Sequence, residues 1–214
     1  AMGFQSKASA VNAVAIGVNS VANAANVVAI GRKALASNTG AIALGDSGTA
    51  SGAQAIAIGE SSLASGANAI ATGYAAKAQN SYDYAAGTQA HALSGKSIAL
   101  GYQAYADSKR DVNNPNDLSS AIAIGANASA IAEAGGNEAI AIGQNTIAKK
   151  SGIAIGYKAN APQNGAIAMG WSANATAAKS GIAIGDRANA TGDNAIAIGG
   201  NADKTATFAN GAGA

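Results

Sequence analysis

The sequence contains no cysteine, only two prolines and only nine aromatic residues among its 214 residues. The lack of cysteine excludes disulfide bridges and thiolate metal sites. The shortage of aromatic residues argues against an ordinary compact core, which needs bulky side chains. Charged residues make up 11% of the chain with a net charge of +2, too few and too balanced for a nucleic-acid-binding surface. No apolar run approaches the roughly 18 residues of a membrane-spanning helix.

A short motif, AIAIG or a close variant, recurs along most of the sequence. The thirteen copies end at Gly17, Gly31, Gly45, Gly59, Gly73, Gly87, Gly101, Gly125, Gly143, Gly156, Gly170, Gly185 and Gly199. Most of these repeat glycines lie 14 residues apart, with one longer step of 24 residues and one of 18. A 14-residue period is too short for helical-hairpin repeats. It predicts one coil of a β-solenoid, with two strands of about five residues and two tight turns.

The columns of the repeat predict which side chains point inward. The residue two before each repeat glycine is alanine in all copies, and the residue five after it is alanine in 12 of 13. The residues three and one before the glycine are Val, Ile, Leu or Met at 23 of 26 positions. Alternation of this kind indicates a strand with two different faces. We expect the alanines of both strands to meet inside a thin coil, the large aliphatics to point outward, and the variable residue four after the glycine to face solvent.

The outward aliphatic side chains predict self-association. Two such side chains per coil form an apolar stripe larger than a soluble monomer tolerates. The predicted interface residues are Ile16, Ile30, Ile42, Ile56, Ile58, Ile70, Ile98, Ile122, Ile124, Ile140, Ile142, Ile155, Ile167, Ile184, Ile196 and Ile198.

The motif AIAIG-x-x-A-x-A-x-x-G, as in AIAIGESSLASG and AIAIGDRANATG, resembles the head repeat of trimeric autotransporter adhesins, the YadA-like head. The resemblance spans roughly residues 11–203. It implies an all-β fold: a left-handed parallel β-roll of about 13 coils per chain, with three chains around one axis and the isoleucine strands at the centre. It also implies a non-catalytic adhesin head without cofactor or metal, exposed on the outer membrane of a bacterium. The implied partners are two further copies of the chain and a host extracellular matrix protein or cell-surface receptor. A membrane is contacted only through an anchor outside this sequence.

The repeat also divides the chain. We expect residues 1–10 to be a cloning remnant and N-terminal lead-in, and residues 11–203 to form the head. Within the head, residues 107–118 are expected to be a loop insertion and residues 131–138 a smaller bulge. Residues 204–214 are expected to be a tail leading to a neck and stalk.

Two features suggest where a ligand binds. The stretch DSKRDVNNPNDL (residues 107–118) combines charge, Asn and Pro, as surface loops do, and function concentrates on such loops. Aromatic residues recur directly after repeat glycines, and Tyr157 and Trp171 share one column in consecutive coils, so we expect their rings to stack at about the 4.8 Å strand spacing. The candidate ligand-binding residues are Tyr102, Tyr105, Asp107, Lys109, Arg110, Asp111, Tyr157 and Trp171. The alternatives are a tolerated insertion and aromatics that only cap the coil edge or wedge against a neighbouring chain. The acidic residues of the insertion match no known calcium-loop spacing.

The copy SYDYAAG departs from the pattern. It places Tyr84 and Ala86 at aliphatic positions and Asp83 where alanine usually stands. Either the packing between chains changes here, or Tyr84 fills space across the axis. The single histidine, His91, lies in the variable column and is expected to face solvent. Since catalysis needs converging groups, no catalytic residue is predicted.

Four other functions are compatible with a short β-repeat to different degrees. A structural spacer that projects another domain has the same repeat. An ice-binding solenoid needs a regular threonine array, whereas the variable column has threonine only at Thr49. A hexapeptide-repeat acyltransferase has a period of six, and 14 is not a multiple of it. An amyloid-like fibre is disfavoured by the uneven steps.

Overall fold

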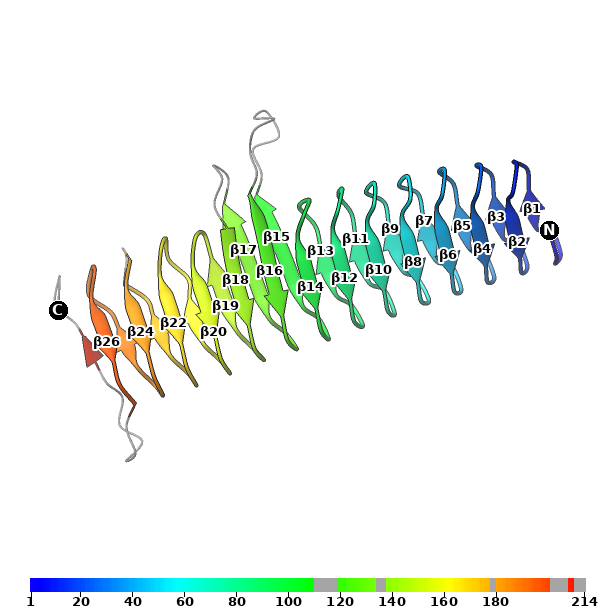
Figure 1. Cartoon of the computed structure of the whole chain (residues 1–214). Helices are drawn as coiled ribbons and strands as arrows, with labels where there is room; N and C mark the ends of the chain where they lie inside the picture. The colour runs from blue at the N-terminus through cyan, green and yellow to red at the C-terminus, as the bar shows by residue number, and fades with distance from the viewer. Residues whose placement is uncertain (110–118, 134–137, 178–179, 201–207, 210–214) are drawn as a thin grey trace. The chain divides into compact units, whose positions relative to one another are not determined.

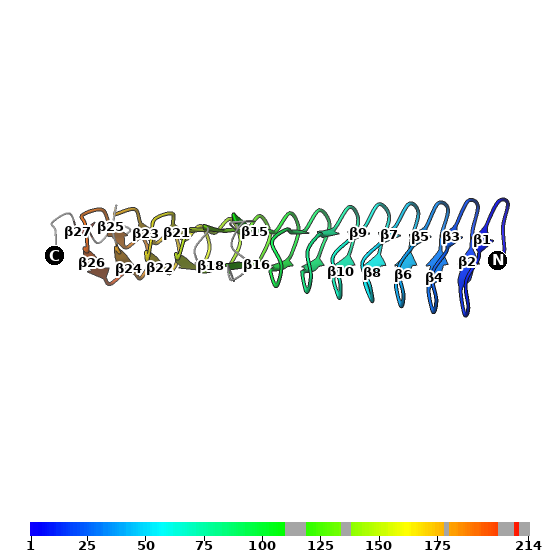
Figure 2. The ribbon, with the colours of Figure 1, turned by 90° about the horizontal axis from the view of Figure 1, so that it is seen from above.

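The computed structural model describes residues 1–109, 119–133, 138–177, 180–200 and 208–209. All regular secondary structure in these residues is β-strand. The chain divides into two units, Ala1–Gln103 and Ala104–Ala214. In each unit the chain alternates between two parallel sheets, one built from even-numbered and one from odd-numbered strands (Figures 1 and 2). We call the even-numbered sheet the isoleucine sheet and the odd-numbered sheet the second sheet.

The first unit holds seven strands in each sheet. Its isoleucine sheet consists of β2 (Val14–Ile16), β4 (Val28–Ile30), β6 (Ile42–Leu44), β8 (Ile56–Ile58), β10 (Ile70–Thr72), β12 (Tyr84–Ala86) and β14 (Ile98–Leu100). Its second sheet consists of β1 (Lys7–Ala8), β3 (Val21–Ala22), β5 (Leu35–Ala36), β7 (Thr49–Ala50), β9 (Leu63–Ala64), β11 (Lys77–Ala78) and β13 (His91–Ala92).

The second unit repeats this arrangement. Its isoleucine sheet consists of β16 (Ser120–Ile124), β18 (Glu138–Ile142), β20 (Ile153–Ile155), β22 (Ile167–Met169), β24 (Ile182–Ile184) and β26 (Ile196–Ile198). Its second sheet consists of β15 (Tyr105–Lys109), β17 (Ser129–Glu133), β19 (Ile147–Lys149), β21 (Asn160–Ala161), β23 (Asn174–Ala175), β25 (Asn189–Ala190) and β27 (Phe208–Ala209). The predicted all-β parallel solenoid of about 13 coils is therefore confirmed.

The register of the sheets places each repeat column in a ladder. On β8 and β10, Ile56 pairs with Ile70 and Ala57 with Ala71. The sequence period thus becomes the strand-to-strand step, because residues in equivalent positions of consecutive coils lie side by side in a parallel sheet.

The interior of each coil is made of alanine, as the columns predict. Ala57 and Ala71 of the isoleucine sheet and Ala64 and Ala78 of the second sheet are all 0% exposed. Polar residues in the inward columns are satisfied locally: the Ser62 hydroxyl donates to the Gly59 carbonyl at 2.9 Å. Because nearly all inward positions hold small side chains, with a few larger ones such as Val27, Asp83 and Thr146, the bulky aliphatics lie outside.

The repeat glycine opens the turn that joins the isoleucine sheet to the second sheet. We call this glycine and the two residues after it the glycine turn. Gly59 has φ of +127°, and a Cβ there would lie 2.5 Å from the carbonyl oxygen of Gly73 in the next coil. The third residue of the turn, Ser61, is left-handed with φ of +56°. The glycine column is therefore required by both backbone conformation and close coil stacking.

The strands differ in length from the prediction. Most strands of the isoleucine sheet have three residues and most strands of the second sheet have two, rather than the predicted five or so. The tight turns take up the rest of each coil. Only the strands beside the two insertions, β15 to β18, have five residues.

The predicted loop boundaries were partly wrong. Asp107 and Lys109 belong to β15 and pair with Ile131 and Glu133 of β17, while Glu138 begins β18. The inserted residues thus first lengthen the strands. The remaining inserted residues, 110–118 and 134–137, lie outside the described part of the chain.

The predicted ends were also partly wrong. Met2 bridges to Ile16, β1 pairs with β3, and Gly3 has φ of +127°. The expected lead-in therefore forms a further coil, one repeat before Gly17. In the expected tail, residues 208–209 form β27 and pair with β25; the other tail residues lie outside the described part.

Candidate functional site

The sixteen predicted interface isoleucines all lie on the isoleucine sheet, at positions three or one before a repeat glycine. None of them is buried by the described part of the chain. Ile16 and Ile30 are 38% exposed, Ile58 is 39% exposed and Ile198 is 66% exposed. We call the outward side of this sheet the isoleucine face. Its alanine neighbours point the opposite way, so the predicted orientation of the strands is confirmed.

The outward side of the second sheet is different in chemistry. Its variable column, four residues after the glycine, is only half-exposed and holds polar and apolar side chains alike. In the second unit, Asn160 donates to Asn174 at 2.9 Å, and Asn174 donates to Asn189 at 3.2 Å. This surface therefore carries polar side chains that hydrogen-bond to one another, whereas the isoleucine face is almost entirely aliphatic.

The glycine turn exposes the residue that follows the glycine. Because the glycine and the third residue both have positive φ, the middle residue is held at the outer edge of the coil. Tyr74 is 49% exposed, Tyr102 is 53% exposed and Trp171 is 44% exposed at this position. An aromatic ring placed there presents both apolar area and a polar tip, a combination enriched in protein interfaces.

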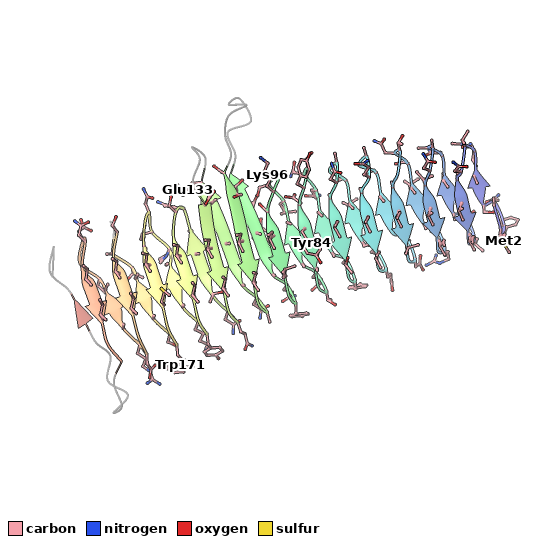
Figure 3. All side chains as sticks on the ribbon, in the orientation of Figure 1. Met2, Tyr84, Lys96, Glu133 and Trp171 are labelled. Carbon is pink, nitrogen blue, oxygen red and sulfur yellow. The ribbon has the colours of Figure 1, made fainter. Side chains whose placement is uncertain are left out.

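In the second unit this edge carries an aromatic and cationic cluster. Tyr157 and Trp171 stack with ring centroids 6.1 Å apart and an interplanar angle of 17°. The Lys158 ammonium lies 5.1 Å from the Tyr157 centroid, and the Arg187 guanidinium carbon lies 4.1 Å from the Trp171 centroid. We call these four residues the stacked cluster. Figure 3 shows Trp171 at one edge of the unit and Glu133 at the opposite edge.

The stacking of Tyr157 on Trp171 was predicted from their shared column, although the centroids are further apart than the expected strand spacing of about 4.8 Å. The two cations are not predicted, because the shared column of Tyr157 and Trp171 says nothing about the third residue of the turn. Their signal was present: Lys158 and Arg187 are both the third residue of a glycine turn, and their long side chains reach over the ring beside them. The Arg187 guanidinium also lies 3.5 Å from the Asp186 carboxylate.

A second predicted pair lies on β15. The Tyr105 hydroxyl donates to the Asp107 carboxylate at 3.1 Å. Burial raises the pKa of the Tyr105 phenol, and the charge of Asp107 adds to the effect. This pair lies several coils from the stacked cluster, so the structure brings the candidate residues together in pairs and not as one site. Lys109 continues β15, and Arg110 and Asp111 lie outside the described residues.

Among the described residues, the remaining ionisable side chains do not come together in one site. Asp83 is 1% exposed, and its carboxylate accepts backbone N–H bonds from Asn80 at 2.8 Å and Ser97 at 3.0 Å. Burial raises the pKa of the Asp83 carboxyl despite these bonds. His91 is half-buried on the second sheet, not fully solvent-exposed as predicted, and burial together with the charge of Lys77 lowers its pKa. Asp83 thus serves as a turn acceptor inside the coil.

Within the described ranges, no group of three His, Cys, Asp or Glu residues is placed to hold a metal ion. The same residues contain no helix with the length and apolarity needed to cross a membrane.

Comparison with known families agrees with the coil geometry. A family model described as the YadA head domain repeat (2 copies) matches residues 1–20, 8–34, 22–47, 50–76, 78–104, 149–173 and 177–202. No curated protein matches the chain. The first matched segment includes the additional coil at Gly3, and together the matches cover well over half of the sequence. This chain therefore belongs to the YadA head family and is a YadA-like head domain of a trimeric autotransporter adhesin.

Proposed function

We propose that this head assembles as a homotrimer through its isoleucine face and attaches a bacterium to host cells or extracellular matrix proteins. The observation that carries the proposal is the isoleucine face itself. It presents aliphatic side chains at 23 of 26 outward positions, and the described part of the chain does not bury them. Membership in a family of bacterial surface-exposed adhesin domains supplies the functional class.

Self-association through this face is supported by the alternation of the strands. In the described strands of the isoleucine sheet the inward alanines are at most 2% exposed inside the coil, so only the aliphatic side is left to be covered by other copies. Burying apolar surface against other copies of the same face is favourable at about 25 cal/mol per Å². The same packing leaves the second sheet and the turns free to face outward, toward a ligand.

We assign adhesion to the glycine turns of the second unit, with the stacked cluster as the principal contact. Tyr, Trp and Arg are the residue types that dominate binding energy at protein interfaces. In the stacked cluster the two rings and the guanidinium are held in place by each other, so little conformational entropy is lost when they meet a ligand. Three copies of the cluster in one trimer multiply a weak contact by avidity. Tyr105 and Asp107 are proposed as a second, smaller contact.

The test is a binding assay on a panel of immobilised matrix proteins: a triple-helical collagen, fibronectin and laminin. The double variant Tyr157→Ala/Trp171→Ala should lose at least tenfold in apparent affinity for whichever protein the parent binds. The matched control is Tyr74→Ala, which removes an exposed aromatic from the same turn position in the first unit. Solution mass is measured for every variant, so that loss of binding is separated from loss of the trimer.

Equal losses in the control and the double variant would refute the assignment to the stacked cluster. A parent that binds no matrix protein and no host cell would favour the other function, a spacer that projects another domain. We further propose display on the bacterial outer membrane, with no catalytic role, no nucleic-acid partner and no cofactor.

A further inference from the structure

The isoleucine face is irregular at a single place. All three exceptions to its aliphatic pattern, Thr72, Tyr84 and Ala86, lie on two neighbouring strands, β10 and β12. Thr72 pairs with Ala86, and Ile70 pairs with Tyr84. One column therefore has two small side chains in succession, while the other column has one large aromatic side chain beside them. Figure 3 labels Tyr84 on β12 within this unit.

Tyr84 stands out from the face. It is 40% exposed and has Ile70 and Ile98 as its neighbours in the ladder. Ala86, two residues later on the same outward side, is flanked by Thr72 and Leu100. A tyrosine is larger than the isoleucine it replaces, and alanine and threonine are smaller. One strand thus carries both a projection and, next to it, a shallow depression.

Rotational symmetry brings these two features together. When copies are related by an axis parallel to the direction of coil stacking, the column three before the glycine in one copy faces the column one before the glycine in its neighbour. At equal height, Tyr84 then meets Ala86 of the partner subunit. In that register the ring lies opposite the smallest side chain of the column, whereas a slip of one coil places it opposite Thr72 of the partner subunit or Leu100 of the partner subunit, which are both larger.

We propose that Tyr84, together with the depression at Thr72 and Ala86, is a registration site that fixes the axial position of neighbouring copies. The proposal rests on the self-association of the isoleucine face proposed above. It goes further by naming the residues that favour one axial register over registers shifted by whole coils.

A registration site is needed because the rest of the face is nearly degenerate. Sliding one copy by one coil replaces isoleucine with isoleucine or a similar aliphatic almost everywhere, so the slipped face remains compatible with its partner. At Tyr84 the slip is resisted. After a slip of one coil in one direction, the Tyr84 ring meets Leu100 of the partner subunit. After a slip in the other direction, Ile98 faces Ala86 of the partner subunit and leaves a gap. A single polar position in a coiled coil sets register in the same way.

The first test exchanges the two side chains. Tyr84→Ala leaves a gap and Ala86→Tyr creates a clash, so each should lower the midpoint of thermal dissociation of the trimer. The double variant Tyr84→Ala/Ala86→Tyr restores a large residue opposite a small one and should recover at least half of the combined loss. If Tyr84 only packs on its own sheet, the dissociation midpoint of the double variant will instead fall by the sum of the two single losses. That result would overturn the proposal.

The second test reads the register directly. Because the chain has no cysteine, a single Glu60→Cys at an exposed glycine turn carries one spin label per copy. The parent trimer should give one interspin distance. The regularised variant Thr72→Ile/Tyr84→Ile/Ala86→Ile should give additional, longer distances from slipped copies, at an unchanged solution mass. A single distance in the regularised variant contradicts the registration role, whereas a monomeric parent contradicts self-association itself.

Discussion

Four serine substitutions on the isoleucine face are expected to dissociate the assembly without unfolding the coil. The substituted residues are Ile56, Ile58, Ile122 and Ile124. Their side chains point away from the alanine interior, which stays intact. The variant therefore removes hydrocarbon from the surface that other copies cover and leaves the packing within each coil unchanged.

The magnitude follows from the exposure in the single chain. Complete burial of an isoleucine side chain is worth about 1.5–3 kcal/mol, and Ile58 keeps 39% of its surface exposed. Covering that share in the trimer contributes roughly 0.6–1.2 kcal/mol per side chain. Four positions in each of three chains then contribute about 7–14 kcal/mol. A micromolar dissociation constant corresponds to about 8 kcal/mol, so this loss is comparable to the whole free energy that holds a micromolar assembly together.

The assay is solution mass by light scattering, with circular dichroism to confirm that the β-structure is retained. The matched control carries four serines on the outward side of the second sheet, at Val21, Leu35, Leu63 and Ile147. Ile147 has the same exposure as Ile58, at 39%. The parent and the control should both have three times the mass of one chain, and the isoleucine variant should have the mass of one. Equal behaviour of the two variants would refute the assignment of the isoleucine face.

Three further perturbations test other parts of the structure. Gly59→Ala places a Cβ against the next repeat glycine, at a position with positive φ. Strain of about 1–3 kcal/mol should lower the thermal midpoint by several degrees. The control Gly40→Asn, at a left-handed position with φ of +72°, should be nearly neutral. Burial raises the pKa of the Asp83 carboxyl above 3.8, so the folded state binds a proton more readily than the unfolded state. The stability of the parent relative to Asp83→Asn should therefore increase as the pH falls from 7 toward 4. A pH-independent difference would contradict the burial of an ionised carboxylate. Trp171 is the only tryptophan, and Arg187→Ala should uncover its ring, so that iodide quenches its fluorescence more strongly while stability falls by about 0.5–1 kcal/mol; unchanged quenching would argue that the guanidinium does not cover the ring in solution.

Most of the fold was predictable because the repeat is strict. A fixed period with alternating small and branched side chains determines both the strand-to-strand register and the face each residue takes, as Ile56 opposite Ile70 and Ala57 opposite Ala71 illustrate. The first coil was missed because the sequence before Gly3 is too short to contain the motif. The extended strands β15 to β18 were missed because the charged residues of an insertion look like loop, although their backbones continue the ladder.

The candidate site was predictable only where it follows the columns. Tyr157 and Trp171 share a column in consecutive coils, so their stacking could be foreseen. Arg187 lies over Trp171 from a different position of the turn, and only a three-dimensional view of how far its side chain reaches reveals the contact. The ligand does not follow from the coil, because the same scaffold supports many surfaces.

The close approach of each repeat glycine to the carbonyl of the next coil has a consequence for how such a head changes in length. The contact is nearly the same in these coils: a Cβ at Gly17, Gly59 or Gly143 would lie 2.4, 2.5 or 2.6 Å from the carbonyl oxygen of the next repeat glycine. Duplication or loss of one regular 14-residue coil therefore leaves the backbone contacts between the remaining coils in place. The distance from the bacterial surface to the tip of the head would then change in steps of about 4.8 Å, the spacing of one coil.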